Sequence, residues 1–347
     1  MAQFYFYYDN FLGDRARCVP DPAMPMRLKV HSTTPINTGV WGWVWHNVAR
    51  VRQGVLRGEY LIWPDGRLAI ARDGTCIKIN VDVENFASIP LSEQAQSFEF
   101  QTMTRTLLDA WDQFPLVEDV SILTNINQLN FGHFMMDLLP NIRHVSNFEF
   151  SHFLIPHFLL EKPNRRDLLT RCLDGRGLIP MSQPVRVKNL LLGHSSKGHY
   201  DLMWLREKTG LSVPSGRKRY YLQRREGVSR PGNLAETPEL LDLLKKFGFE
   251  FVDFGTGRET VAAELELIDG PAIIFGAHGA NLANCVYLNP PLSFIEVMGS
   301  RHISPEFYYY SHRLGFDHHV ICCDGYDEAG NMVVDCPALE KILVSIL

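Results

Sequence analysis

The chain has 347 residues, of which 46% are hydrophobic and 21% charged, a globular composition with enough chain for two domains of about 150 residues. Its net charge of -5 argues against nucleic-acid binding and gives no bulk sign of attraction to anionic membranes. The seven cysteines are scattered and include no CxxC pair, which disfavours a disulfide framework or a zinc ribbon and favours reduced thiols.

The first 115 residues predict mainly β-structure. Residues 1–35 are rich in proline and polar residues after an aromatic start, so we expect irregular structure with one short strand. Residues 40–100 carry β-branched residues between turn signals, a pattern typical of strands. Residues 98–114 have the spacing of a helix.

From about residue 117, strands alternate with helices. The expected strands are 117–124, 150–155, 185–193, 220–224, 249–254, 272–275, 293–297 and 318–323. The expected helices are 130–147 (with a preceding loop), 164–173, 199–209, 237–247, 259–268, 281–287, 305–314 and 338–347. Repeated strand–helix units predict parallel sheets with helices on both faces. The chain therefore predicts an α/β fold with two Rossmann-like domains and a ligand cleft between them.

Residues 273–289 (IIFGAHGANLANCVYLN) are the stretch best suited to bind an anion. A buried strand runs into a loop of small residues and then into a helix. Small residues let the backbone come close to a ligand, and a helix N-terminus offers free N–H groups and partial positive charge. His278 can add a side-chain donor at the same place. The alternative is an ordinary strand–turn–helix connection that uses glycine for tightness.

The densest basic stretch, residues 217–233, is a second candidate for anion binding. Arg224 ends an expected strand, and Arg230 follows in a loop that contains glycine. Arginine forks match phosphate oxygens, and Asn233 can bond the loop backbone or a ligand. The alternative is a solvated basic loop, but the position at the mouth of the second sheet favours function.

Residues 130–140 hold a candidate for proton transfer. His133 and Asp137 are four residues apart and therefore share one face of the expected helix. A carboxylate beside an imidazole can orient the ring, raise its basicity or itself take a proton from a hydroxyl. The alternative is a helix-start histidine bonded to a surface aspartate. Glu296, at the end of another strand, can hold a ribose or sugar hydroxyl or cap a loop.

Other common motifs are weak or missing. Residues 254–260 (FGTGRET) follow a strand as a dinucleotide loop does, but the third small residue is Thr260 and the strand is late in the chain. This disfavours NAD binding. The sequence has no GxxxxGK[ST], GxSxG or HExxH, which removes P-loop, α/β-hydrolase and zincin interpretations.

Four motifs in this order, spanning roughly residues 120–300, resemble glycosyltransferase family 61. They are Gly132-His133-Phe134 with Asp137 and Pro140, residues 221–224 with Arg230 and Asn233, residues 276–284, and residues 294–296. The resemblance implies a GT-B fold, an inverting mechanism and a nucleotide-sugar donor, without a metal or other cofactor. Two departures leave the donor open: Glu264 lies in a helix that usually carries glutamine, and the usual second glycine and threonine of the third motif are Ala280 or Asn281 and Ala283.

The resemblance also implies roles for the candidate residues. Asp137 is the expected catalytic base, with His133 as its partner or replacement. The expected donor-binding residues are Arg224, Arg230, Asn233, His278, Gly279, Ala280, Asn281, Asn284 and Glu296. The expected domains are an acceptor-side domain at 1–205 with a β-rich part at 1–115, a nucleotide-sugar domain at 206–336, and a C-terminal helix at 337–347.

The family includes plant and animal transferases and bacterial capsule or exopolysaccharide proteins. The N-terminus lacks the pattern of a secretory signal, and no stretch approaches the roughly 20 apolar residues of a membrane span. We therefore expect a bacterial cytoplasmic hexosyl- or pentosyltransferase that uses a glycan or lipid-linked glycan acceptor. The aromatic residues 4–8 have two interpretations: they bind the inner surface of the membrane, or they form a buried strand. Two other functions remain: another sugar-nucleotide enzyme, such as an epimerase or phosphorylase, and an inactive GT-B-like binding scaffold.

Overall fold

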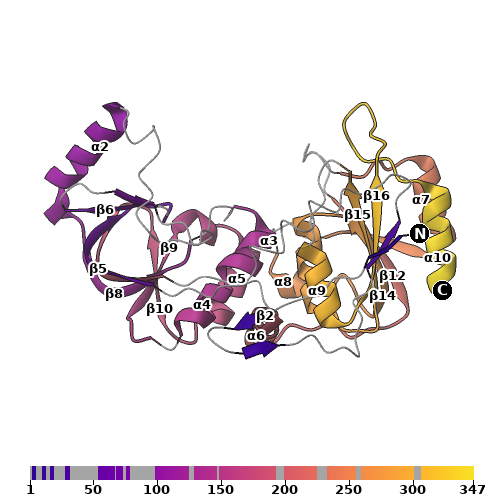
Figure 1. Cartoon of the computed structure of the whole chain (residues 1–347), viewed down its shortest axis with the longest axis horizontal. Helices are drawn as coiled ribbons and strands as arrows, with labels where there is room; N and C mark the ends of the chain where they lie inside the picture. The colour runs from indigo at the N-terminus through magenta and orange to yellow at the C-terminus, as the bar shows by residue number, and fades with distance from the viewer. Residues whose placement is uncertain are drawn as a thin grey trace. The chain divides into compact units, whose positions relative to one another are not determined.

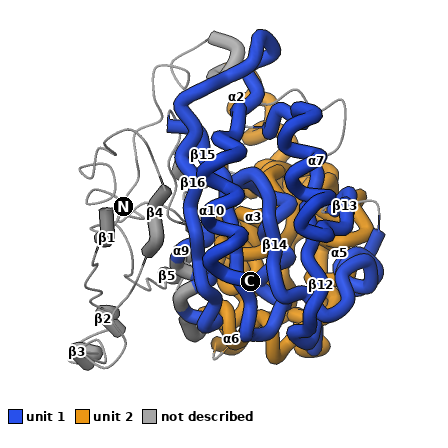
Figure 2. Tube along the Cα trace, turned by 90° about the vertical axis from the view of Figure 1, so that its right-hand side faces the viewer, with its two compact units in different colours: residues 1–48, 210–347 blue, residues 49–209 orange. Residues whose placement is uncertain are grey.

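A computed structural model describes most of the chain. The described residues are 2–4, 10–12, 16–18, 28–31, 54–66, 68–72, 76–78, 98–124, 129–146, 148–192, 199–224, 233–254, 259–300 and 306–347. The chain forms two compact units, unit 1 (residues 1–48 and 210–347) and unit 2 (residues 49–209), which Figure 2 distinguishes by colour. No helix within the described ranges is long and apolar enough to cross a membrane.

Unit 2 is built on a seven-stranded mixed sheet with the order β10-β9-β8-β11-β5-β6-β7. The four strands at one side run parallel, whereas β5, β6 and β7 pair antiparallel. The strands are β5 (Gly54–Ile62), β6 (Leu68–Ala71), β7 (Cys76–Lys78), β8 (Leu116–Ile122), β9 (His152–Pro156), β10 (Gly177–Met181) and β11 (Val185–Leu192). Alternate residues such as Val120, Ile122 and Val187 fill one buried cluster, because successive side chains of a strand point to opposite faces.

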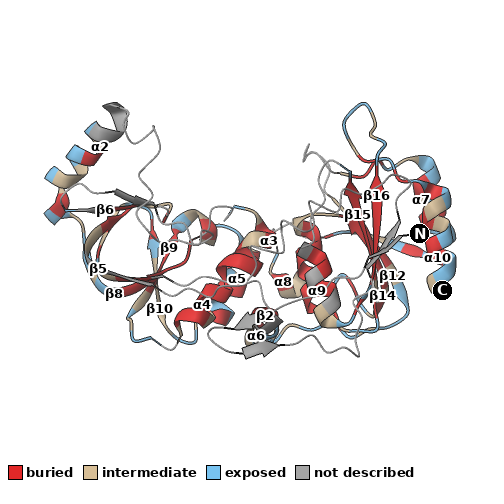
Figure 3. Ribbon diagram, viewed as in Figure 1, coloured by how far each residue is buried: buried red, intermediate tan, exposed pale blue. Residues whose placement is uncertain are grey.

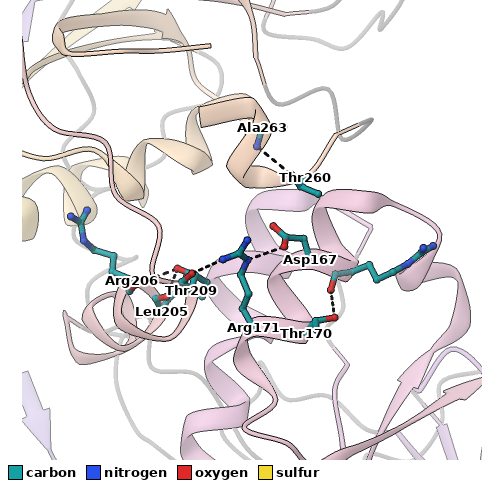
Figure 4. A network of polar contacts seen from close by, with 9 residues as sticks. Asp167, Thr170, Arg171, Leu205, Arg206, Thr209, Thr260 and Ala263 are labelled. Carbon is teal, nitrogen blue, oxygen red and sulfur yellow. Dashed lines mark hydrogen bonds and ion pairs between the residues drawn. The ribbon is translucent and has the colours of Figure 1, made fainter. Parts of the chain in front are cut away.

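The described helices of unit 2 lie before, between and after its parallel strands along the chain (Figure 1). They are α2 (Phe98–Asp109), η2 (Trp111–Gln113), α3 (Phe131–His133), the π-helix η3 (Phe134–Leu138), α4 (Pro140–Val145), η4 (His157–Leu160), α5 (Pro163–Cys172) and α6 (His199–Thr209). Arg171 joins two of them: its Nε lies 2.8 Å from Asp167 on α5, and its Nη1 donates to the carbonyl of Thr209 at 2.9 Å (Figure 4). The Thr209 hydroxyl donates back to Leu205 at 2.8 Å, so the last turn of α6 is held at both side chain and backbone.

Unit 1 is built on a second seven-stranded sheet, with the order β1-β4-β16-β15-β14-β12-β13. All neighbours are parallel except β1 and β4. The strands are β1 (Ala2–Phe4), β4 (Leu28–His31), β12 (Lys218–Gln223), β13 (Phe249–Asp253), β14 (Pro271–Ala277), β15 (Ser293–Gly299) and β16 (Asp317–Cys323). Figure 3 shows β14, β15 and β16 buried over most of their length, as expected for parallel strands covered on both faces.

Helices cover this sheet and bury an apolar stripe against it (Figure 1). They are α7 (Pro238–Lys246), α8 (Val261–Leu265), the 3-10 helix η5 (Ala280–Tyr287), α9 (Glu306–Leu314) and α10 (Cys336–Ile346). Leu244 of α7 and Leu339 of α10 share one core cluster with Phe275 of β14. The Thr237 hydroxyl accepts from Leu240 N at 3.2 Å and caps α7, and Pro238 occupies the first turn, as the sequence predicts.

The structure confirms a mixed α/β fold with two largely parallel sheets and corrects several local predictions. Residues 1–35 contain four short strands rather than one, β1, β4 and the hairpin pair β2 (Asn10–Leu12) and β3 (Ala16–Cys18). Strand β10 was not expected, and the helix expected at 281–287 is the 3-10 helix η5. Residues 40–48, part of the expected β-rich stretch, lie outside the described residues. The division at Thr209 is close to the expected boundary at 205, whereas residues 1–48 and α10 group with unit 1.

Candidate functional site

The carboxyl edge of the unit 1 sheet brings together residues that are far apart in the sequence. Strands β12, β14 and β15 are parallel neighbours, so their carboxyl ends lie at one edge. Arg224 directly follows β12, and His278 directly follows β14. Ligands of open parallel sheets bind outside such an edge. Arg224 and His278, which the sequence analysis assigned to donor binding, therefore lie at the same edge of this sheet.

Arg224 lies against the backbone that follows β14. Its Nη2 donates to the carbonyl oxygen of His278, and its Nη1 donates to Asn233 Oδ1 at 3.1 Å. Gly279 has a φ of +153°, and a Cβ at this position would collide with the guanidinium. Glycine is needed here both for its backbone conformation and for the close approach of Arg224. Arg230 lies outside the described residues.

Glu296 on β15 lies between two imidazoles. His278 Nδ1 is 2.5 Å from Glu296 Oε1, and His318 Nε2 on β16 is 3.1 Å from Oε2. Burial raises the pKa of the Glu296 carboxyl, but the two imidazoles outweigh this, so its pKa lies below the usual value. The side chain is 0% exposed, and both oxygens contact protein groups. This placement differs from the expectation that Glu296 holds a sugar hydroxyl.

His318 is a site residue that the sequence analysis did not select. In the structure His318 is the register partner of Phe294, two residues before Glu296, so Glu296 and His318 point to the same face of the sheet. The register of two parallel strands is needed to find this pairing, and the sequence alone does not provide it.

The small-residue segment after His278 is held inside the unit by two asparagines. Ala280 begins η5, Asn281 Nδ2 donates to the carbonyl of Leu222 at 3.3 Å, and Asn284 Nδ2 donates to Glu264 Oε2 at 2.7 Å. Asn281, Asn284 and Glu264 are all buried. Their described contacts fix η5 against β12 and α8, and thereby fix the backbone of Gly279.

The Asn284–Glu264 pair gives a stability prediction. Asn284→Asp places a second carboxylate against Glu264 in a buried site, where two like charges cannot both ionise without cost. We expect a loss of about 3–5 kcal/mol in unfolding free energy at pH 8, with part of it recovered near pH 5, measured by urea unfolding. The double variant Asn284→Asp with Glu264→Gln restores one donor and one acceptor and should recover most of the loss. Equal stability of Asn284→Asp and wild type at pH 8 would contradict this account.

The His133–Asp137 pair forms in unit 2, as predicted. Asn130 caps α3 by accepting from Gly132 N at 2.8 Å, and the chain then widens into a π-helical turn that carries Asp137. His133 Nδ1 is 2.6 Å from Asp137 Oδ2. The His133 side chain is 23% exposed and that of Asp137 only 6%. Single π turns in helices are frequent at functional sites.

Arg165 on α5 contacts both the start of α3 and the π-helical turn η3. Its Nη2 donates to the carbonyl of Leu129, one residue before the Asn130 cap, and its guanidinium carbon lies 5.7 Å from the centre of the Phe134 ring. Burial lowers the pKa of Arg165. The guanidinium therefore ties the start of α3 to α5 through one hydrogen bond and one cation–π contact.

The dinucleotide-like segment at 254–260 lies partly outside the described residues. Residues 255–258 of the dinucleotide-like segment lie outside the described residues, and Thr260 caps α8 by accepting from Ala263 N at 3.2 Å (Figure 4). Within the described ranges, no group of three or more His, Cys, Asp or Glu side chains is arranged to hold a metal ion.

Comparison with known proteins identifies a family whose matched segment includes several of these residues. Residues 131–295 match the family described as Glycosyltransferase 61. The match includes His133, Asp137, Arg224 and His278 and ends one residue before Glu296. No curated protein matches the chain. Residues 131–295 of this chain are therefore similar to the glycosyltransferase 61 family.

Proposed function

We propose that this glycosyltransferase moves a hexose or pentose from a nucleotide-sugar donor to a hydroxyl of a glycan acceptor, with inversion and without a metal. The two units are then the two domains of a GT-B fold. The observation that carries the proposal is the cluster at the carboxyl edge of unit 1, where Arg224 and His278 meet at the backbone of Gly279. A guanidinium and an imidazole can bind the oxygens of a diphosphate, and the glycine beside them lets the ligand come close to the backbone.

Unit 1 is assigned to the donor. The bond between sugar and diphosphate breaks as the acceptor attacks, and negative charge accumulates on the leaving diphosphate. Arg224 and His278 are fixed before the reaction by Asn233 and Glu296, so they stabilise that charge without reorganising. We assign Arg230 to donor binding as well, because it follows Arg224 in the basic stretch at residues 217–233.

Unit 2 is assigned to the acceptor. Inversion needs one base that removes the proton of the acceptor hydroxyl during its attack on the anomeric carbon. The sequence favoured Asp137, but its side chain is nearly buried and faces the His133 ring. We therefore assign proton removal to His133 Nε2, with Asp137 accepting from Nδ1–H and stabilising the imidazolium that forms.

The proposal extends to the biological setting. Bacterial members of the family support a role in capsule, exopolysaccharide or lipopolysaccharide synthesis, with a lipid-linked acceptor at the inner face of the membrane. Mass spectrometry of the products formed with lipid-linked and free oligosaccharide acceptors tests this assignment. Transfer to free glycans alone would remove the membrane part.

Nucleotide binding tests the proposed function. We expect one or more nucleoside diphosphates to bind wild-type protein in a calorimetric screen, and the matching nucleotide sugar to be consumed only when an acceptor is present. Consumption of donor without acceptor would indicate an epimerase or phosphorylase instead. Failure of every nucleotide to bind would favour a glycan-binding scaffold.

A further inference from the structure

The fully buried carboxylate of Glu296 needs a positive charge beside it. Removing a carboxylate from water is costly unless a cation compensates it. Four titratable side chains face it in the described residues: His278 just after β14, Cys285 on η5, and His318 and Cys322 on β16. The two thiols stay neutral, because burial and the nearby carboxylates raise their pKa, that of Cys322 to about 11. Among these four described side chains, the two imidazoles are the groups that can supply the charge.

The surroundings of the two rings place the charge on His278. His318 Nδ1 is buried without a hydrogen-bond partner in the described structure, so an imidazolium there would bury a charged N–H unsatisfied. A neutral His318 instead donates from Nε2 to Glu296 and leaves only a lone pair at Nδ1. His278 is 0.6 Å closer to the carboxylate (2.5 against 3.1 Å) and 14% exposed. Tyr308 stacks on His318, and burial raises its pKa, so it stays neutral too.

Arg224 completes the geometry around His278. It donates to the carbonyl of His278, so its positive charge lies beside that of the His278 imidazolium at the carboxyl edge. The Phe307 ring from α9 lies edge-on to the His278 ring, with centroids 5.2 Å apart. With Nδ1 committed to Glu296, Nε2 is the His278 atom assigned to the ligand.

We propose that Glu296 and His318 are positioning residues that keep His278 as an imidazolium directed at the diphosphate of the donor. This inference rests on the proposed function for the identity of the ligand. It gives the unit 1 site two adjacent cations, Arg224 and His278, with the second generated by a carboxylate inside the sheet. Glu296 then acts on the donor through His278 and not through a sugar hydroxyl.

The protonation of His278 is the first test and does not depend on activity. Histidine NMR on wild type, with His278→Gln used for assignment, should show His278 as an imidazolium at pH 7.5, where an ordinary histidine with a pKa of about 6.5 is mostly neutral. In Glu296→Gln the His278 signal should become that of a neutral ring. A neutral His278 in wild type at pH 7.5, or the same titration in both proteins, would overturn the proposal.

Binding of the nucleoside diphosphate found in the calorimetric screen is the second test. Glu296→Gln should weaken binding by about tenfold or more at pH 7.5, because a charged donor becomes a neutral one. The difference should shrink near pH 5.5, where His278 protonates without help. Equal binding by Glu296→Gln and wild type at pH 7.5 would overturn the proposal. If no nucleotide binds wild type, the proposed function fails, while the NMR result still decides the charge on His278.

His318 provides the matched pair of variants if Glu296→Gln does not fold. His318→Gln keeps an N–H donor for Glu296 Oε2 and should leave the His278 imidazolium and nucleotide affinity close to wild type. His318→Leu removes that donor, frees the carboxylate to turn, and should lower both. Identical His278 signals in these two variants would contradict a positioning role for His318.

Discussion

Asp137→Asn should lower the turnover number by about a hundredfold or more while nucleoside diphosphate affinity stays near wild type. The carboxylate contacts His133 Nδ1 at 2.6 Å, and asparagine can present an N–H to the same nitrogen and select the wrong tautomer. Single-turnover rates with saturating donor and acceptor measure the chemical step, and calorimetry measures the affinity. Near-normal turnover in this variant would remove Asp137 from the mechanism.

Variants of His133 separate the two candidate bases. His133→Gly should lose turnover to at least the same extent, and added imidazole should restore part of it if the ring itself accepts the proton. Absence of any rescue by imidazole, together with turnover retained in His133→Gln, would return the role of base to Asp137. Arg166→Gln, on α5 at an exposed site, is the matched control and should keep wild-type turnover.

Local sequence patterns predicted the parts of the fold that depend on neighbouring residues. The amphipathic spacing and cap signals of 237–247 identified α7 closely, because Thr237 and Pro238 act within one helical turn. His133 and Asp137 are in contact, as their spacing predicted. The turn that carries Asp137 is π-helical, but side chains four residues apart remain neighbours there. Arg224 and His278 were each identified from a local pattern, a basic stretch and a small-residue loop after a strand, and the sheet order brings them together.

The features that the sequence did not predict depend on contacts between distant segments. Strand β4 pairs with β16, nearly 290 residues later, and no local pattern records that pairing. The Glu296–His318 contact depends on the register of two strands separated by α9. Residues 177–181 contain a proline that favours a loop, yet they form the edge strand β10, where a missing N–H is tolerated.

The burial of Glu296 shows why a carboxylate at a strand end is ambiguous in a sequence. Its neighbours Phe294 and Ile295 identify a strand but not which face meets solvent, because both faces of this sheet are covered. The sequence therefore suggested a hydroxyl ligand, whereas the structure gives both oxygens to imidazoles. Because the buried carboxylate lies between two histidines, we expect it to stabilise a positive charge on His278 and not to bind a sugar hydroxyl.

Arg224→Lys should lower kcat/KM for the donor by about 10²–10³-fold, since it removes a fixed donor at the site of developing charge. The guanidinium reaches Asn233 and the carbonyl of His278 at once, and one ammonium group cannot replace that fork. Steady-state rates over a range of donor concentrations measure the effect.

The matched control for Arg224→Lys is Lys218→Gln at the opposite end of the same strand. Lys218 makes an exposed contact with Asp269 at 3.5 Å, and pairs of this kind contribute little. The control removes one positive charge from β12 without touching the carboxyl edge, so it should keep wild-type kcat/KM. Because Arg224→Lys keeps the net charge of unit 1, a loss in Lys218→Gln as large as that in Arg224→Lys would mean that kcat/KM responds to substitutions along β12 in general and not to the guanidinium that lies against Gly279.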